Sequence, residues 1–413
     1  MDTARADALA AREHLAREGW IARDTESFRH LLPPPAAVWL GSGPDAPDCE
    51  AHPLDGAGWT LHPVGQTPQG RVDARWLDAA DAAQRAELFA GLPQPGDGDA
   101  APFAWAHRAL CRHGLRLRVG GEPGVSRDPG ETVWLQLRHQ PRSAVEAPLL
   151  VIDVQPGVHG VLVETHERAP LHCTHDVVQN LQVHVHLGEG ATLQHVRIAL
   201  PQRGDHLAHH LFARLARGAQ YQQALIAAGS GYHLQRSVVD LAAERSAARI
   251  AGVVFAAGTA IEQQVRMAHR AAHTSSSVEA LALAAGAARA VLNAHTGIAA
   301  GCDEADARQR LSGIPTGGQP KLVLRPHLEI LHDLVQAAHG ATWGALPDEA
   351  VFYARQRGLD EARARGLIVE GMASALLARG LEGPALLETL GIDALLAAAV
   401  AGHLAPAEEA HHG

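Results

Sequence analysis

Glycines recur through the middle of the chain at a spacing that few folds accommodate. Seven of them stand at Gly190, Gly204, Gly218, Gly231, Gly258, Gly286 and Gly301, which gives intervals of 14, 14, 13, 27, 28 and 15 residues. The two long intervals are about twice 14, and the skipped positions fall at Arg245 and Ala272. Between the glycines, apolar and polar residues alternate, as they do over residues 193–200, and this is the period of a β-strand. The pattern indicates a repeated unit of one strand and one turn.

A strand-and-turn unit of this length is too short to bury its own apolar face, so such units must stack on one another as a solenoid. Two strands per coil of about 28 residues describe a flattened β-helix. The alanine-rich runs at residues 242–248 and 280–290 would suit helices by propensity, but a glycine about every 14 residues breaks helices of that length. We therefore expect a mainly β protein built on a parallel β-helix.

Helical patterns flank this region at both ends of the chain. Residues 3–17, 78–89 and 103–113 favour helices before it. After it, residues 349–357 form one predicted helix, Asp360 caps a second that runs to residue 379, and a third runs from residue 384 towards 400. The expected organisation is a mostly helical domain at residues 1–113, the β-helix at residues 114–343 and a helical domain at residues 344–413.

Composition excludes several classes of protein. The chain has 35 basic against 45 acidic side chains, a net charge of −10, and only 16 aromatic residues (7 Trp, 3 Tyr and 6 Phe), which argues against a nucleic-acid partner. Its four cysteines, at positions 49, 111, 173 and 302, form no closely spaced pair of the zinc-knuckle or CxxC kind, and they fit a reducing compartment. No apolar stretch resembles a signal peptide or a membrane span, so we expect a cytoplasmic protein without a membrane partner.

Histidines form the densest group of chemically useful side chains. His184 and His186 lie two positions apart on a predicted strand and point to the same face, with Glu189 close behind. Together with His172 and His175, they suggest one alternative function, a metal-dependent cupin-like or β-helix enzyme. The competing interpretation is that these histidines are ordinary polar residues of solvent-facing strands and that Glu189 belongs to a turn.

The usual marks of nucleotide chemistry are missing. The sequence contains no GxxxxGK[ST] loop, no GxSxG elbow and no GxGxxG after a strand. We therefore expect no nucleotide to be bound by this chain, and any ATP hydrolysis must come from another subunit.

The most distinctive segment spans residues 325–344 and joins the last predicted strands to the C-terminal helices. Its AHGAT core at residues 338–342, with residues 348–360 and 362–365 after it, resembles the C-terminal signature of the SufB/SufD family of iron–sulfur cluster assembly proteins. Two features place it on the SufD side of that family: the AHGAT core itself, and Ala354 where SufB carries a cysteine after the Phe-Tyr pair. The resemblance covers about residues 114–379 and is diffuse outside the signature.

The resemblance implies a right-handed parallel β-helix with helical ends, and a function. A SufD-like chain is a non-catalytic scaffold of the SufBCD complex: it forms a heterodimer with SufB through the β-helix and contacts the ATPase SufC through its C-terminal helices. His339 matches the family histidine that holds the nascent, transient iron–sulfur cluster at the SufB interface. Phe352, Tyr353 and Arg357 are the implied SufC contacts. Whether a reduced flavin binds the complex is left open.

Three alternatives accompany these expectations. His339 would have only a structural role if it merely caps a strand beside a turn, and Phe352 would be core rather than contact if it packs inside the helical bundle. The chain would be a homodimeric β-solenoid adaptor if its open end pairs with a second copy, and SufD-like proteins are also expected to self-associate without SufB. Ala337 departs from the family pattern, which often has a cysteine there, so no role of that cysteine transfers to this chain.

Overall fold

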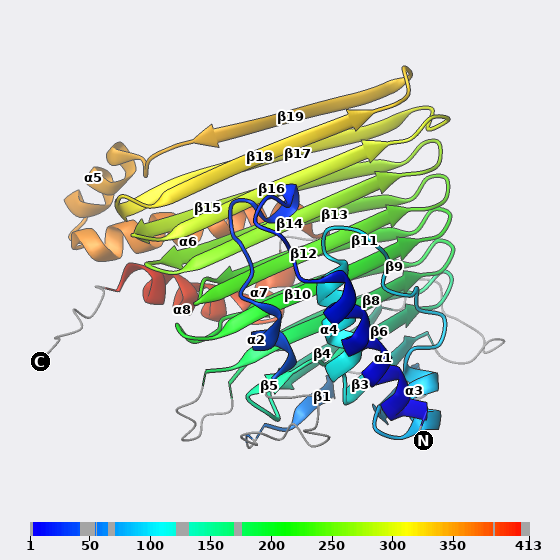
Figure 1. Ribbon diagram of the computed structural model, residues 1–413. Helices are drawn as coiled ribbons and strands as arrows, with labels where there is room; N and C mark the ends of the chain where they lie inside the picture. Colours follow the sequence, from blue (N-terminus) through cyan, green and yellow to red (C-terminus); the bar gives the residue numbers. More distant parts are fainter. Residues whose placement is uncertain are drawn as a thin grey trace, which may run out of the picture.

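Two large β-sheets face each other along most of the molecule (Figure 1). They come from a computed structural model that describes residues 3–41, 54, 56–64, 71–120, 132–168, 176–382 and 385–405. Consecutive strands from β6 to β19 alternate between the two sheets, and each pairs in parallel with the equivalent strand of the next coil. This arrangement confirms the predicted parallel β-solenoid with helices at both ends.

Each sheet has nine strands along its main path, and the second sheet has a tenth strand, β5, off that path. In order, the first sheet contains β1 (Gly58–Pro63), β4 (Thr132–Gln140), β7 (His159–His166), β9 (Thr192–Ala199), β11 (Gln220–Ala228), β13 (Ala247–Ala257), β15 (Ser275–Gly286), β17 (Ala305–Gly318) and β19 (Val335–Trp343). The second contains β18 (Lys321–Ile330), β16 (Arg289–Ile298), β14 (Ala260–His269), β12 (Tyr232–Leu241), β10 (His206–Leu215), β8 (Val178–Leu187), β6 (Leu149–Val154), β3 (His113–Val119) and β2 (Val72–Asp78), with β5 (Val145–Glu146) beside β8.

Left-handed turns at one end of the coils explain part of the glycine period. Gly190 and Gly218 have φ of 65° and 63°, the left-handed conformation that glycine adopts without a steric penalty. Arg245 and His273 take the next two such turns with φ of 60° and 58°. Arg245 is the skipped position of the sequence period, and His273 lies one residue after the other. The period therefore reflects turn geometry, which non-glycine residues also adopt at a modest energetic cost.

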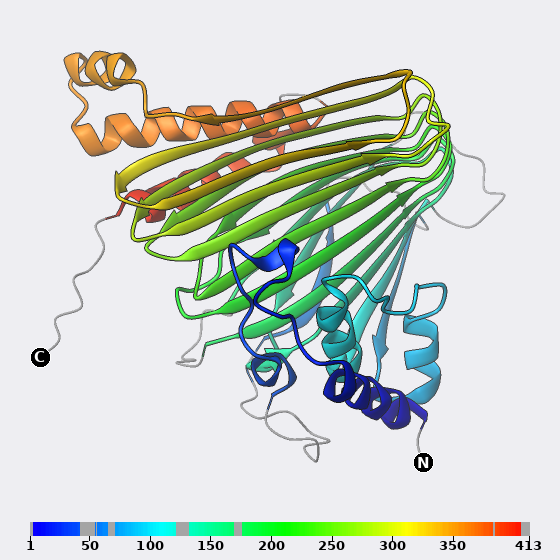
Figure 2. The ribbon, with the colours of Figure 1, turned by 45° about the horizontal axis from the view of Figure 1, so that its top comes forward.

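C-terminal helices cover the outer face of the first sheet (Figure 2). They are α6 (Glu361–Gly380), α7 (Ala385–Thr389) and α8 (Ile392–Leu404), whereas α5 (Asp348–Gln356) packs on α6 and buries none of its own residues. α6 packs so closely on β13 that a Cβ on Gly380 would lie 2.4 Å from the Cβ of Ala251. Gly380 therefore does more than end the helix: it allows the helix to contact the sheet. Asp360 caps α6 as predicted, because its carboxylate accepts the backbone N–H of Arg363.

The N-terminal region lies on the outer face of the second sheet, with Phe28, Trp39 and Phe103 packed against Tyr232 and neighbouring residues. It contains α1 (Thr3–Glu18), the 3-10 turn η1 (Glu26–Phe28), α2 (Ala36–Leu40), α3 (Ala82–Leu88) and α4 (Ala101–Leu110). The expectation of a mostly helical region omitted part of the structure, because β1 and β2 also form here and pair antiparallel with β4 and β3. They cover the edges of the first coil that would otherwise be free to pair. No helix in the described ranges has the length and apolarity needed to span a bilayer.

Candidate functional site

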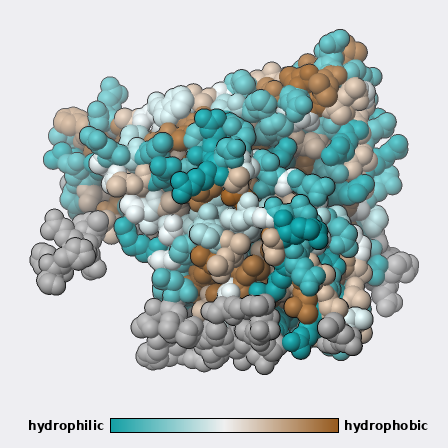
Figure 3. Space-filling model, viewed as in Figure 1, coloured by the Kyte–Doolittle hydropathy of each residue, from teal (hydrophilic) through white to brown (hydrophobic). Residues whose placement is uncertain are grey.

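The opposite end of the solenoid is open. β19 is the edge of the first sheet and β18 is the edge of the second, and no described strand covers either. The turn between them exposes 65% of Leu331 and 67% of Leu334, and Trp343 at the other end of β19 is 61% exposed. Figure 3 shows the corresponding hydrophobic area at the upper right, over the end of the last coil. Apolar side chains exposed in such a group mark an interaction surface.

The two edge strands differ in chemistry. β18 carries Pro326 and the charged residues Lys321, Arg325 and Glu329, and both proline and charge discourage further strand pairing. β19 has neither a charged residue nor a proline over its nine residues. Its free backbone groups therefore remain suited to pairing with a strand of another chain.

His339 lies in the middle of β19, not at a turn, so the strand-cap alternative does not describe its position. It is exposed, and it pairs in register with Gln309 of β17. Ala337 shares its face two residues earlier. The two cysteines within the described ranges are both buried: Cys111 donates to the His113 carbonyl, and Cys302 donates to the carbonyl of His269. His339 therefore presents an imidazole, a potential metal ligand, at the open end of the solenoid. Neither of these two buried thiols adds a second ligand there.

Helix α5 carries the other predicted contact residues. Phe352 is 64% exposed and Tyr353 is 58% exposed, and α5 buries none of its residues. The alternative in which Phe352 belongs to the core of the bundle is therefore wrong. The guanidinium of Arg357 lies 4.4 Å from the centre of the Tyr353 ring and donates to its hydroxyl. Together the three side chains form an aromatic and cationic surface of the kind enriched at protein interfaces.

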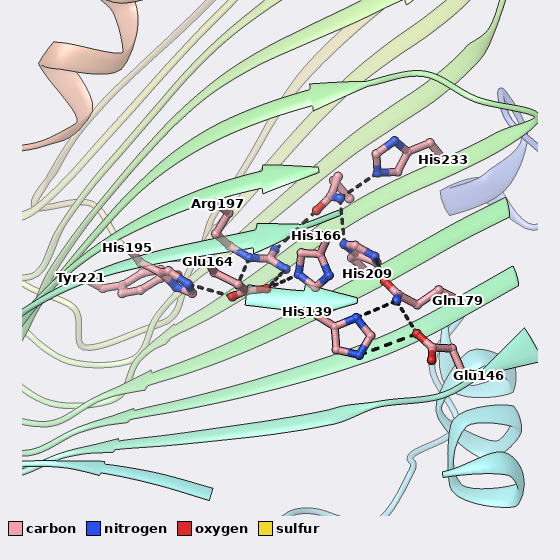
Figure 4. Close-up of polar contacts among 11 residues, drawn as sticks. His139, Glu146, Glu164, His166, Gln179, His195, Arg197, His209, Tyr221 and His233 are labelled. Carbon is pink, nitrogen blue, oxygen red and sulfur yellow. Dashed lines mark hydrogen bonds and ion pairs between the residues drawn. The ribbon is translucent and has the colours of Figure 1, made fainter. Parts of the chain in front are cut away.

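A polar network inside the solenoid is centred on Glu164 (Figure 4). The Arg197 guanidinium donates to both carboxylate oxygens, at 2.9 and 3.2 Å. His166 and His195 approach the same carboxylate through Nε2, at 2.6 and 2.8 Å. Burial opposes ionisation of Glu164, but Arg197 and the two imidazoles outweigh it and keep the pKa of the carboxyl well below its usual range. The interior therefore holds a fully buried ion pair.

A chain of hydrogen bonds leads from this ion pair towards β5. His233 Nδ1 must donate to the Ala228 carbonyl at 2.5 Å, because a carbonyl oxygen only accepts. His233 Nε2 then accepts from the Gln235 amide, which also donates to His209 Nδ1. His209 is left to donate from Nε2 to Gln179.

The Gln179 side-chain amide extends this chain of hydrogen bonds to His139 and Glu146. Gln179 donates to His139 Nδ1 at 3.3 Å and to Glu146 at 2.6 Å. Burial lowers the pKa values of His139, His209 and His233, so all three rings are neutral at pH 7. Burial raises the pKa of Glu146 to about 7.

The sequence contains a signal for this interior network that neither the glycine period nor the histidine spacing captures. His209 has the same parity along β10 as the core residues Leu211 and Leu215, and His195 has the parity of Leu193 on β9. Residues of equal parity on a strand share a face. His195 and His209 therefore point into the core and not to solvent.

The described residues of the alternative metal site do not lie together in an arrangement that could bind a metal ion. His184 stacks on Phe212 at 5.0 Å between ring centres, and His186 pairs with Asp153 at 2.9 Å, while Glu189 is exposed in a turn. His172 and His175 lie outside the described residues. Across the ranges that the structure describes, no three histidine, cysteine or acidic side chains are arranged to hold a metal ion.

Comparison with known proteins gives the family. Residues 137–372, more than half of the chain, match the family model described as SUF system FeS cluster assembly, SufBD core domain. The chain belongs to the SufBD family. The match includes most of the solenoid, β19 with His339, and helix α5.

Relatives within the SufBD family support the same assignment at modest identity. The SufD iron–sulfur cluster assembly protein of Escherichia coli (strain K12) is 25% identical over 247 residues, which are 55% of this chain and 58% of that protein. A SufBD family protein of a Synechocystis species is 24% identical over 246 residues, 57% of this chain and 54% of that protein. A Mycobacterium tuberculosis member is 42% identical over 55 residues, 13% of this chain and 14% of its own. The match thus spans little more than half the length of the first two relatives.

Proposed function

We propose that this SufBD family member is a non-catalytic scaffold subunit of a cytoplasmic, ATP-driven complex that assembles iron–sulfur clusters. Its open β-helix end pairs with a SufB-like chain, and its C-terminal helices contact a SufC-like ATPase. The nascent cluster, the cargo of the complex, forms at the SufB-like interface with His339 as a ligand from this side. The observation that carries the proposal is β19: an uncharged, proline-free edge strand that presents an exposed histidine within the segment that matches the family.

The chemistry of His339 fits this role. Neutral imidazole is a good ligand for iron, and an exposed position on an edge strand lets the ring reach a partner placed against that edge. The remaining ligands come from the partner in this proposal, since the two described cysteines are buried and position 337 is alanine. One imidazole alone is too few ligands for a cluster, so the site is complete only at the interface.

Replacing His339 by alanine should lower cluster assembly by about tenfold or more, because losing even a supporting group of a metal ligand costs 10–100-fold in affinity or activity. Iron and sulfide content of the purified complex, with its visible absorbance, gives the measurement. Gln336→Ala, also exposed on β19, is the matched control and should assemble clusters normally. Equal cluster content in the His339→Ala and wild-type complexes would remove His339 from the proposal.

Phe352→Asp should weaken binding of the SufC-like ATPase by about tenfold or more, since exposed aromatic anchors at an interface contribute about 2 kcal/mol each. The free energy of unfolding of the chain alone should change by less than about 0.5 kcal/mol, because the side chain is mostly exposed. Titration calorimetry with the purified ATPase measures the affinity. Arg363→Ala, an exposed change on α6, is the control, and equal affinity of the Phe352→Asp and control variants would place the ATPase elsewhere.

A further inference from the structure

Gln309 is a buried glutamine directly beside His339 on the first sheet. The two residues are in register on β17 and β19, and paired residues of a parallel ladder point to the same face. The row continues from Gln309 through Val278 and Ile250, which belong to the interior core. His339 therefore stands on the row of side chains that faces the inside of the solenoid, next to the Gln309 amide.

The hydrogen bonds of Gln309 fix the orientation of its amide. Nε2 donates to Thr296 Oγ1 at 2.7 Å and to the backbone carbonyl of His327 at 3.0 Å. Because a carbonyl oxygen only accepts, the amide atom facing His327 must be the nitrogen. Oε1 is the atom left over, and it is buried without a hydrogen-bond partner among the described residues. A buried acceptor without a partner is rare in native proteins and calls for an explanation.

We propose that Gln309 is a positioning residue for His339. Its Oε1 accepts one ring N–H of the imidazole, which fixes the tautomer and turns the lone pair of the other ring nitrogen towards the open end. Adjacent strands lie about 4.8 Å apart, within reach of such a bond. The inference rests on the proposed role of His339 as a cluster ligand, because metal-bound histidines usually donate their second N–H to a carbonyl or carboxylate group.

The Gln309 amide is buried and held in place by two hydrogen bonds, whereas His339 is exposed on an edge strand. Thr296 on β16 and the His327 carbonyl on β18 hold the amide from the second sheet, and Gln309 is only 4% exposed. His339 lies on the last strand, which has a neighbouring strand on one side only. A fixed acceptor beside an exposed imidazole on an edge strand reduces the number of orientations that the ring samples before a partner docks.

Long-range proton–nitrogen NMR spectra of the full chain with 15N-labelled histidine test the inference, with His339→Gln used to assign the ring. We expect one neutral tautomer of His339 in the wild type and the mixture of a free imidazole in Gln309→Met. Thr296→Val removes one of the bonds that orient the amide and should shift the population in the same direction. Gln223→Met is the matched control. It changes a buried glutamine on β11, three strands away from Gln309 in the same row of paired residues, and should leave the His339 tautomer unaltered.

The outcomes separate this inference from the proposed function. A tautomer mixture in the wild type, or an unchanged tautomer in both Gln309→Met and Thr296→Val, would overturn the inference whatever His339→Ala does to cluster assembly. In the reconstituted complex, Gln309→Met should slow cluster loading about tenfold and Gln223→Met should not. If the tautomer responds to Gln309→Met while His339→Ala assembles clusters normally, the bond between the two side chains stands and the ligand role of His339 falls.

Discussion

Replacing Glu164 by glutamine should lower the free energy of unfolding by about 3–5 kcal/mol, the usual effect of removing one partner of a buried ion pair. Arg197 is buried and directs two nitrogens at the carboxylate, at 2.9 and 3.2 Å. Without the negative charge, the guanidinium stays inside the solenoid with no counter-ion. Urea unfolding followed by circular dichroism measures the loss.

Two further variants make the Glu164 prediction specific. Arg197→Met should also destabilise the chain. The loss of unfolding free energy in the double variant should be about 2 kcal/mol smaller than the sum of the two single losses, because the second change removes a charge that is already unpaired. Glu167→Gln, in a half-exposed pair with Arg138, should change stability by less than about 1 kcal/mol. Additive losses in the double variant would show that the ion pair does not act as a unit.

Lowering the pH from 7 to 5.5 should remove about 5 kcal/mol of stability. The physical cause is burial, which holds the pKa of each of seven histidines below the unfolded value of about 6.5. These are His107, His139, His184, His209, His210, His233 and His269. Four of the pKa values are about 3 to 4.

The sign follows from which state binds protons. Above pH 6.5 the histidines are neutral in both states and their shifted pKa values do not matter. Below it the unfolded chain takes up protons that the folded chain refuses, so each histidine lowers the free energy of unfolding by about 1.4 kcal/mol per pH unit. Seven of them lower it by about 9 kcal/mol between pH 7 and 5.5.

Two buried carboxyls oppose this trend. Burial raises the pKa of Glu146 to about 7 and that of Glu262 to about 8, so both are largely protonated in the folded state where the unfolded chain is ionised. Acidification relieves this difference and returns about 3 to 4 kcal/mol over the same interval. The net effect remains destabilising because the histidines outnumber the carboxyls.

Denaturant titrations at half-unit steps of pH measure this dependence. His210→Leu should reduce the slope below pH 6 by about 1.4 kcal/mol per pH unit, because it removes one buried titrating ring. The matched change at an exposed histidine, His159→Leu, should leave the slope unaltered. A free energy of unfolding that stays constant from pH 7 to 5.5 would mean that the interior histidines accept protons without disturbing the fold.

The coils could be predicted from the sequence because the turns impose a local constraint. A left-handed turn needs glycine or a tolerant residue at a fixed place in each coil, and this shows directly as a period. The helix cap at Asp360 and the helical ends follow from equally local rules. The segment that resembles the family signature contains His339, and the residues after it form the exposed surface of α5.

The interior network could not be predicted with the same rules. Glu164 is stable in the core only because Arg197, 33 residues further along, meets it from the next coil. Whether a polar residue on a strand faces solvent or a partner depends on the register between coils, which composition and period do not specify. The exposure of Phe352 has a similar origin, since only the packing of α5 against its surroundings decides whether an apolar helical residue is core or contact.

Anaerobic co-expression of this chain with SufB-like and SufC-like partners, followed by native mass spectrometry of the purified complex, tests the scaffold role most directly. One spectrum reports the ratio of subunits and any bound iron and sulfide. We expect one copy of this chain with one SufB-like chain and about two copies of the ATPase. Recovery of this chain only as a homodimer, or alone with a tightly held metal ion, would contradict the scaffold role.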